Sequence, residues 1–557
     1  MLPAMLPPIA TGVSDFTKLR ERGALYVDKT AFVTDVLSSP TDVTLFCRPR
    51  RFGKTLNMTT LRAFVEPGPP GVRALFDGLA IAHAGELVWR HFQAHPVIWL
   101  SFKDVKARTW AEASVSIAEL IGMEARRHAP RVDPTLTEED ARTFGHMRRD
   151  DQLTTAHHGA LLRLSQWIHG AHGQKPIVLI DEYDTPLHTA YEYGYYDEAV
   201  TFFRTFLGGG LKDNVYLDRA VLTGILRVAK ESIFSGLNNL EVHTVLSRQH
   251  GDAFGFTEDE VRALLDQAEV PADVAAGMRQ FYNGYRIGGF DLYNPWSVTQ
   301  FFRDLPHRLA SYWVGTSDNA LVRQLLIERG TVDGPTLEAI LRGEAVSVLI
   351  DEHLTLLDAE SRPESLLSLL VMSGYLRVDD VTPEGTRVRA TVRAPNTEVR
   401  LALADLAERT VTAALREPVD PLAASLLAGD TEGFGRRLQF LVETALSFHT
   451  TGGRHPERVY QAFVGGLLVG MEKTHRVETD PESGFGRADV LVIPKRAGLP
   501  GVAMELKVGG PEALDAAMAQ LRERDYAAKL RQAGATPIRL LAAAFDGKRV
   551  VVRFAEA

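Results

Sequence analysis

The sequence has very little cysteine, with Cys47 the only such residue among 557. A single thiol excludes an intramolecular disulfide and any zinc site built on several cysteines. Cys47 also stands within an apolar run, which is more typical of a small core residue than of a nucleophile. This cysteine usage favours a cytoplasmic protein.

Long apolar runs and a strong positive charge are also missing. No run approaches the roughly 20 apolar residues needed to span a bilayer, and the proline-rich residues 1–12 lack the basic start of a signal peptide. The net charge is −9, which argues against a chain that coats nucleic acid non-specifically. Over residues 451–557, however, 16 Lys and Arg outnumber 13 Asp and Glu, so this part permits a local nucleic-acid site. We predict no membrane segment.

The length and the patterning together predict several domains. A chain of 557 residues is too long for one hydrophobic core, and its 45% apolar content is ordinary for a globular protein. The pattern becomes mainly helical from about residue 254, and helices dominate to about residue 430 apart from a short β-like insertion near residues 375–392. We therefore predict three parts, residues 1–250, 251–435 and 436–557. Neither an internal repeat nor a low-complexity linker marks these boundaries.

The first half is organised around a basic loop. An apolar run over residues 43–47 predicts a strand, and a helix is expected over residues 56–64, after Gly53-Lys54-Thr55. This order is typical of a P-loop, in which backbone N–H groups hold phosphates, a lysine reaches the terminal phosphates and a hydroxyl holds Mg²⁺. The generic motif begins with glycine where Arg48 stands. On this stretch alone, a basic turn before a helix remains the alternative. The predicted nucleotide-binding residues are Arg50, Arg51, Phe52, Gly53, Lys54 and Thr55.

A second apolar run, residues 176–180, ends in Asp181 and Glu182. In P-loop ATPases an aspartate at this place contributes to the Mg²⁺ shell, and a following glutamate can polarise the attacking water. The alternative is a buried parallel strand whose end carries solvated acids. A further strand over residues 219–225 closes with Thr223, which could contact the γ-phosphate or the water. Arg227, just beyond, could reach a phosphate; for both residues a structural role is the alternative. Together these features predict ATP and Mg²⁺ as cofactors.

Three local signals concern the rest of the first 300 residues. Gly208-Gly209-Gly210 is expected to end a helix. Thr257 and Glu260 have the spacing of a capping box at a helix start. Two aromatic turns, residues 281–286 and 292–297, could make a docking surface or anchor turns over a core.

The C-terminal part carries an acidic and basic constellation. Asp489 opens an expected strand, and Glu505 and Lys507 share one face of the next strand. Carboxylates of this kind hold Mg²⁺, which lowers the pKa of a bound water, and a lysine could position that water. Glu457, on an expected helix, could add a metal ligand. Gln520, on a helix expected to include Tyr526, could orient substrate or a metal-bound water. The alternative is a surface ladder in which Glu505 and Lys507 simply pair.

These motifs resemble a known family. Tyr26-Val27-Asp28-Lys29-Thr30, the loop from Arg48 to Thr55, Ile180-Asp181-Glu182-Tyr183-Asp184 and Thr223-Gly224-Ile225 look like the bacterial and archaeal AAA-ATPase-like family. In that family the Arg-Pro-Arg-Arg-Phe-Gly-Lys-Thr form of the loop is usual, so Arg48 is no departure from it. Members typically carry a C-terminal PD-(D/E)XK nuclease-type domain, and Asp489…Glu505-x-Lys507 resembles its core, with Ala488 in place of the usual proline.

The resemblance implies an α/β architecture: an AAA-like parallel sheet with helices on both faces, a helical middle and an α/β restriction-endonuclease-like domain. Our first hypothesis is an ATP-binding and ATP-hydrolysing protein with a Mg²⁺-dependent nuclease domain that acts on DNA or RNA. The second is a nucleotide switch whose nuclease-like domain only binds nucleic acid or a protein partner. The third is an ATPase with a purely structural C-terminal domain. The sequence leaves a homo-oligomer open.

Overall fold

The computed structural model describes residues 6–149, 152–227, 237–304, 309–313, 334–352, 363–385, 387–415, 420–445, 456–468, 471, 474–484, 486–546 and 549–557. The chain forms two compact units. The first comprises Met1–Val322 and Ser347–Val399, and the second comprises Arg323–Val346 and Arg400–Ala557. The division into three parts made from the sequence stays a prediction.

The first unit is built on a five-stranded parallel sheet. Its strands are β1 (Val43–Cys47), β2 (Val97–Ser101), β3 (Ile177–Asp181), β4 (Arg219–Gly224) and β5 (Leu240–His243). Their order is β2-β3-β4-β1-β5. Strands β1 and β3 are buried at every position, which explains their uninterrupted apolar sequences. Because β4 lies between them, the basic loop after β1 and the acids that end β3 flank Thr223 on β4.

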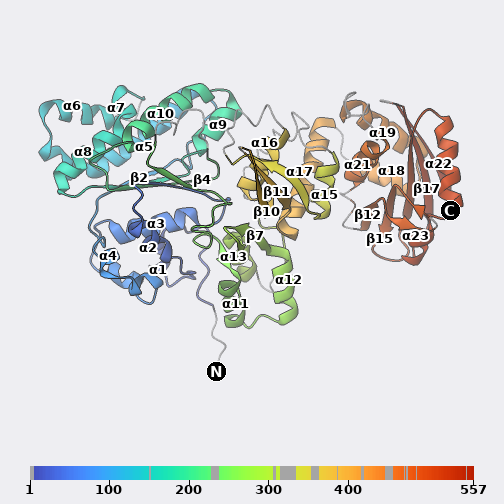
Figure 1. The fold of residues 1–557 in the computed structure, drawn as a ribbon, viewed down its shortest axis with the longest axis horizontal. Coiled ribbons are helices and arrows are strands. Elements are labelled where there is room, and N and C mark those ends of the chain that lie inside the picture. The colour runs from blue at the N-terminus through green and yellow to red at the C-terminus, as the bar shows by residue number, and fades with distance from the viewer. Residues whose placement is uncertain are drawn as a thin grey trace. The chain divides into compact units, whose positions relative to one another are not determined.

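Helices cover both faces of this sheet, as predicted (Figure 1). One face carries α1 (Phe16–Glu21), α2 (Ala31–Ser38), α3 (Lys54–Val65) and α4 (Glu86–Trp89), with the short 3-10 turns η1 (Val72–Phe76) and η2 (Ala80–His83) nearby in sequence. The other carries α5 (Trp110–Val132), α6 (Glu138–Met147), α7 (Thr155–His158), α8 (Ala160–His172), α9 (Thr185–Tyr193) and α10 (Tyr196–Leu211).

The prediction that Gly208-Gly209-Gly210 ends a helix is wrong, because α10 continues to Leu211. A Cβ atom at Gly210 would lie 2.3 Å from Cβ of Leu161 on α8. Gly210 is therefore needed where α10 approaches α8 closely, and packing between the helices outweighs the poor helix propensity of glycine.

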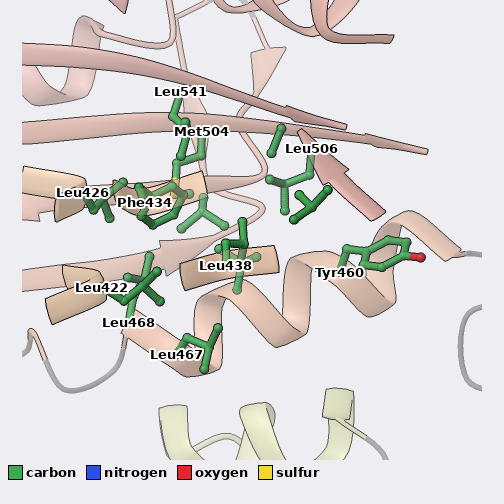
Figure 2. Packing of buried hydrophobic residues seen from close by; sticks show 14 of the residues in the cluster. Leu422, Leu426, Phe434, Leu438, Tyr460, Leu467, Leu468, Met504, Leu506 and Leu541 are labelled. Carbon is green, nitrogen blue, oxygen red and sulfur yellow. The ribbon is translucent and has the colours of Figure 1, made fainter. Parts of the chain in front are cut away.

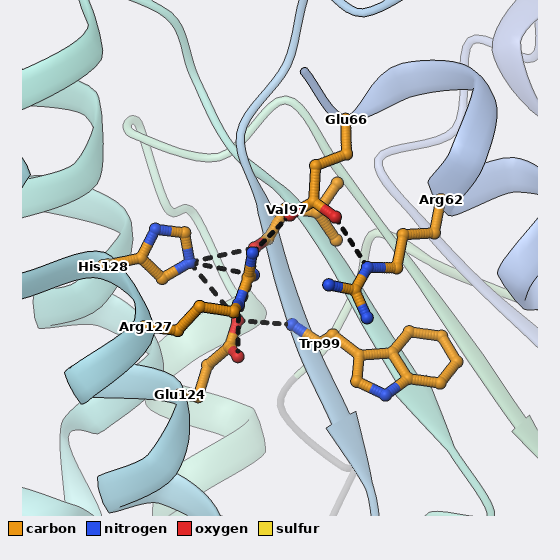
Figure 3. A network of polar contacts seen from close by, with 7 residues as sticks. All are labelled: Arg62, Glu66, Val97, Trp99, Glu124, Arg127 and His128. Atoms are coloured by element: carbon orange, nitrogen blue, oxygen red, sulfur yellow. Dashed lines mark hydrogen bonds and ion pairs between the residues drawn. The ribbon is translucent and has the colours of Figure 1, made fainter. Parts of the chain in front are cut away.

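Side chains of α5 form hydrogen bonds with backbone groups at the edge of β2 that has no neighbouring strand among the described residues (Figure 3). The backbone N–H of Trp99 donates to Oε1 of Glu124 at 2.8 Å. The carbonyl of Val97 accepts from Arg127 and, at 3.0 Å, contacts Nε2 of His128. An unpaired edge is a template for further strand pairing, so these contacts both satisfy the edge and close it.

A middle region of helices and two small sheets completes the first unit. The first sheet, of order β6-β8-β7, contains β6 (Phe256–Thr257), β7 (Asn283–Ile287) and β8 (Phe290–Tyr293); the second, of order β10-β11-β9, contains β9 (Val346–Ile350), β10 (Arg377–Glu384) and β11 (Arg387–Arg393). Its helices are α11 (Glu258–Gln267), α12 (Ala272–Tyr282), α13 (Pro295–Arg303), α16 (Pro363–Ser373) and the start of α17 (Thr397–Leu415). The predicted capping box of Thr257 and Glu260 is confirmed at the start of α11.

The second unit contains a mixed sheet of order β12-β15-β16-β17-β18, in which only β16 and β17 run parallel. The strands are β12 (His475–Thr479), β15 (Val490–Pro494), β16 (Gly501–Val508), β17 (Ile538–Asp546) and β18 (Arg549–Glu556), and β13 (Glu482–Ser483) and β14 (Gly486–Arg487) form a small hairpin. The helices are α15 (Gly334–Arg342), α18 (Asp420–Ala428), α19 (Thr431–Ala445), α21 (Pro456–Leu468), α22 (Glu512–Glu523) and α23 (Ala528–Gln532).

The two faces of this sheet pack into separate cores. Met504 and Leu506 on β16 meet leucines of α18, α19 and α21 (Figure 2). The alternate residue Ala503 packs with Leu514 and Leu521 of α22. Glu505 and Lys507 follow the same alternation as Ala503, which places them on the α22 face. The α/β architecture predicted for both ends of the chain is thus confirmed.

Among the residues that the structure describes, no helix combines the length and the apolar character needed to cross a bilayer.

Candidate nucleotide site and candidate nuclease site

The basic loop between β1 and α3 has the backbone geometry of a phosphate cradle. Gly53 has φ 84° and Arg51 has φ 66°, so two positions close together adopt the left-handed conformation. Such turns aim successive backbone N–H groups into one concavity that binds anions. α3 begins at Lys54, directly after Gly53, so the positive end of the helix dipole lies at the same place.

Lys54 is folded across its own loop. Its Nζ atom donates to the carbonyls of Arg48 and Pro49, each at 3.0 Å, and the residue is 6% exposed. Burial lowers the pKa of Lys54, while Glu182, Asp184 and Asp181 act in the opposite direction. The amine is thus held beside the loop, within a group of carboxylates at the ends of the strands.

Arg48 explains why the loop lacks the generic first glycine. Its guanidinium is fully buried and donates to the carbonyls of Cys47, His243, Thr244 and His250 at 2.8–3.0 Å. Burial lowers the pKa of Arg48 to about 10, so the group stays charged at neutral pH. Arg48 therefore joins the start of the loop to β5 and the segment after it, and it is a structural residue.

Asp181 brings the two predicted threonines together. Oγ1 of Thr55 donates to Oδ2 of Asp181 at 2.8 Å, and Oγ1 of Thr223 donates to Oδ1 at 2.7 Å. Asp181 and Thr223 are both 0% exposed. A hydroxyl and a carboxylate are oxygen donors suited to Mg²⁺, so Thr55 and Asp181 fit the ion that the sequence predicts. Thr223 orients this carboxylate through its donated hydrogen bond.

Glu182 follows at the tip of β3 with φ 52°, an uncommon conformation for a non-glycine residue. Its Oε2 atom accepts from Oγ1 of Thr185 at 3.2 Å. The two acids thus have different hydrogen-bond partners, Thr55 and Thr223 for Asp181 and Thr185 for Glu182. Arg227 follows β4 closely and is the last residue described before residue 237.

Tyr183 and Asp184 bind the backbone just after β4, a role that the sequence did not predict. Oδ2 of Asp184 accepts from the N–H groups of Ile225 and Leu226 at 2.7 and 3.0 Å, and the Tyr183 hydroxyl donates to the Leu226 carbonyl at 2.7 Å. A Cβ atom at Gly224 would lie 2.6 Å from the Tyr183 ring. The residues just before Arg227 are therefore fixed by the segment that follows β3. The acids were visible in the sequence, but this role required knowing that β3 and β4 are neighbours.

In the second unit, Asp489 and Glu505 lie on neighbouring strands. The pairing of β15 with β16 places Val490 opposite Met504, so Asp489 comes level with Glu505. Oδ2 of Asp489 accepts from the backbone N–H of Leu506 at 2.6 Å. Glu505 is 1% exposed, and its Oε1 atom lies 2.9 Å from Nζ of Lys507. The predicted carboxylates and lysine are thus brought together on the face covered by α22.

The structure does not bring the other two predicted residues, Glu457 and Gln520, into contact with these carboxylates among the interactions that it describes. Glu457 lies in the first turn of α21, but its side chain is outside the part of the chain that the structure describes. Gln520 is on α22, where its Nε2 atom donates to the Tyr526 hydroxyl at 3.0 Å. The prediction that Tyr526 belongs to that helix is wrong, because α22 ends at Glu523.

The side chains of this second site offer the type of ligand atom that a hard cation such as Mg²⁺ binds. Asp489 and Glu505 offer carboxylate oxygens, the ligands that Mg²⁺ prefers. Among the described side chains, no group of three or more His, Cys, Asp or Glu gathers around a potential metal position. A complete site thus needs further ligands beyond these two carboxylates, such as water.

Comparisons with known proteins agree with this geometry. Residues 10–234 match the family model described as "Predicted AAA-ATPase", and residues 455–555 match the "PD-(D/E)XK nuclease superfamily". The chain is also 29% identical, over 97% of each chain, to a protein of Azotobacter chroococcum mcd 1 described as "Uncharacterized protein in vnfD 5'region". These matches support a nucleotide-binding protein with a nuclease-like domain. Two parts of the chain are thus similar to known families: residues 10–234 to the predicted AAA-ATPase family and residues 455–555 to the PD-(D/E)XK nuclease superfamily.

Proposed function

We propose that the chain binds and hydrolyses ATP with Mg²⁺ in its first unit, and that its C-terminal domain is a Mg²⁺-dependent nuclease acting on DNA or RNA. The observation that carries the ATP assignment is the pair of hydrogen bonds from Thr55 and Thr223 to the two oxygens of Asp181. They place a hydroxyl, a carboxylate and the lysine loop at the carboxyl ends of three adjacent parallel strands, where α/β sheets bind ligands.

Each residue of the nucleotide site has a distinct role in this proposal. Thr55 and Asp181 hold Mg²⁺, which neutralises charge on the terminal phosphates. The loop from Arg50 to Lys54 binds the phosphates through backbone N–H groups and cationic side chains. Glu182 orients the attacking water and accepts its proton. Thr223 keeps Asp181 in place, and Arg227 contacts a phosphate.

The nuclease assignment uses the carboxylates of the second unit. Asp489 and Glu505 would hold Mg²⁺, with Glu457 as a further ligand, and the bound ion would supply a water of lowered pKa for hydrolysis of a phosphodiester. Lys507 positions that water or stabilises the developing charge. Lys507 pairs with Glu505, which offsets the buried negative charge of this carboxylate. We place the protein in the cytoplasm and leave a homo-oligomer open.

A cleavage assay on the full chain tests the proposal. Plasmid, linear DNA and RNA are incubated with Mg²⁺ or Mn²⁺, with and without ATP, using the parent, Asp489→Ala and Lys507→Ala. Glu523→Ala, at an exposed position of α22, provides the control. Cleavage by the parent and by the control, and none by the other two variants, is the expected result.

A parent that binds nucleic acid without cutting it would refute the nuclease and leave a binding domain. Cleavage by Asp489→Ala at the parent rate would show that the nuclease site lies elsewhere in the chain.

A further inference from the structure

The outer side of the phosphate loop is packed against the middle region of the same unit. Arg51 lies with its guanidinium carbon 4.5 Å from the ring centre of Trp296, and Nδ2 of Asn294 donates to the Arg50 carbonyl at 3.3 Å. Both Asn294 and Trp296 belong to the start of α13, where Asn294 also accepts from the Trp296 N–H and so caps the helix. The loop is therefore joined to the first turn of a helix about 245 residues away in sequence.

Two more contacts continue this packing along the loop. The ring of Phe52 meets the Tyr285 ring edge-on at 4.9 Å, and the Phe52 carbonyl accepts from the Gly255 N–H at 3.2 Å. Gly374, just after α16, has no room for a side chain, because a Cβ atom there would lie 2.7 Å from Pro49. Every residue from Pro49 to Phe52 thus contacts the middle region.

These contacts matter because of the conformation they hold. Arg51 has φ 66°, in the left-handed region that non-glycine residues avoid. Backbones of this kind persist only where the surroundings determine them, and they gather at functional sites. The ring of Trp296 stacks on the side chain of Arg51, and Asn294 fixes the carbonyl that precedes it. The unfavourable turn is therefore held from outside the predicted nucleotide domain.

We propose that Trp296 and Asn294 are positioning residues for ATP, which act by holding the Arg50–Arg51 turn in its phosphate-binding conformation. This inference rests on the proposed ATP function and extends it. The segment from Val43 to Arg227 supplies the groups that touch nucleotide, whereas α13 of the middle region sets the shape of their loop. The two aromatic turns noted in the sequence anchor their turns over a core, since Tyr282, Tyr285 and Tyr293 are at most 3% exposed. In this proposal the second turn also shapes the phosphate loop.

The chain offers a closely matched control for Trp296. Trp89 is also half-buried, its ring lies 4.6 Å from the guanidinium carbon of Arg73, and its Nε1 donates to a backbone carbonyl, as that of Trp296 does. Trp89 lies on α4, outside the phosphate loop. Replacing either tryptophan by alanine thus removes a comparable ring, and only one of the two touches the loop.

The experiment measures the Kd of Mg-ATP by calorimetry and the hydrogen exchange of the amides of residues 50–54 in the nucleotide-free full chain. Trp296→Ala should weaken Mg-ATP roughly tenfold and speed exchange in the loop, whereas Trp296→Phe should restore both because a ring face remains. Asn294→Ser keeps a helix-capping hydroxyl but loses the bond to Arg50, and it should also weaken binding. Trp89→Ala should change neither quantity, whatever it does to the melting temperature.

Unchanged Kd and unchanged loop exchange in Trp296→Ala would overturn the inference, and so would equal effects of Trp89→Ala. A parent that binds no ATP would refute the proposed function instead. In that case faster loop exchange in Trp296→Ala alone would still support the positioning role, and unchanged exchange would refute it.

Discussion

Replacing Glu124 by glutamine should destabilise the first unit most at neutral pH and least in acid. Glu124 is 6% exposed and accepts from the N–H of Trp99 on the edge strand β2. Burial alone would raise the pKa of this carboxyl, but hydrogen bonds from His128 and Arg127 outweigh burial and lower the pKa to about 2. The charged form is therefore the one that the folded chain stabilises (Figure 3).

The magnitude follows from linkage. Between an ordinary pKa of 4.5 and a folded value of about 2, the charged carboxylate contributes about 3 kcal/mol to the free energy of unfolding. Because the folded pKa is depressed, this contribution is complete above pH 4.5 and is lost as the pH falls towards 2. Both carboxylate oxygens of Glu124 accept from Arg127, whereas glutamine has one acceptor oxygen and an amide nitrogen that can only donate. The variant should therefore lack most of the pH-dependent contribution that the parent has at neutral pH.

Urea unfolding followed by tryptophan fluorescence provides the assay. All six tryptophans, at positions 89, 99, 110, 167, 296 and 313, belong to the first unit, so fluorescence reports on that unit within the full chain. The difference between parent and Glu124→Gln should be about 3 kcal/mol at pH 7 and should shrink between pH 4.5 and 3. Glu119→Gln, at an exposed position of the same helix, is the control. A difference that does not change with pH would refute the reasoning.

Two further predictions concern other carboxylates. Glu182→Gln should keep Mg-ATP binding but slow hydrolysis by roughly 10² or more, since it removes the group that accepts the water's proton; turnover at the parent rate, measured by phosphate release, would assign this role elsewhere. Glu398 is buried and accepts from Ser297, Tyr312 and Trp313, and burial raises its pKa to about 7. Stability should therefore fall by up to about 3 kcal/mol as the pH rises from 4.5 through 7, and Glu398→Gln should abolish this fall in urea unfolding; a fall of the same size in the variant would contradict the prediction.

The sequence predicted those parts of the fold that depend on local patterns. Buried runs such as residues 43–47 and 177–181 became parallel strands, and Thr257 with Glu260 formed the expected capping box. The prediction that Gly208–Gly210 ends a helix failed because glycine at position 210 is required by the close approach of Leu161 from another helix. A contact between two helices cannot be read from a local sequence pattern.

The candidate sites were also predicted in part. Residue types and spacing identified Lys54, Asp181, Asp489 and Glu505, because phosphate and metal chemistry restrict the choice of side chain. The structural role of Arg48 could not be predicted, since its four carbonyl partners come partly from residues 243–250, far along the chain. The same is true of Trp296, whose contact with Arg51 exists only once the middle region is folded.

Calorimetry of Mg-ATP binding to the full chain and to Lys54→Ala tests the central claim most directly. Lys54 now donates to two carbonyls of its own loop, and a phosphate would give its amine a charged partner instead. Lys103→Ala, at an exposed position of the same unit, serves as the control. The account predicts saturable, Mg²⁺-dependent binding to the parent and the control, and at least roughly 100-fold weaker binding to Lys54→Ala. Equal affinity of all three proteins, or no binding by the parent, would contradict it.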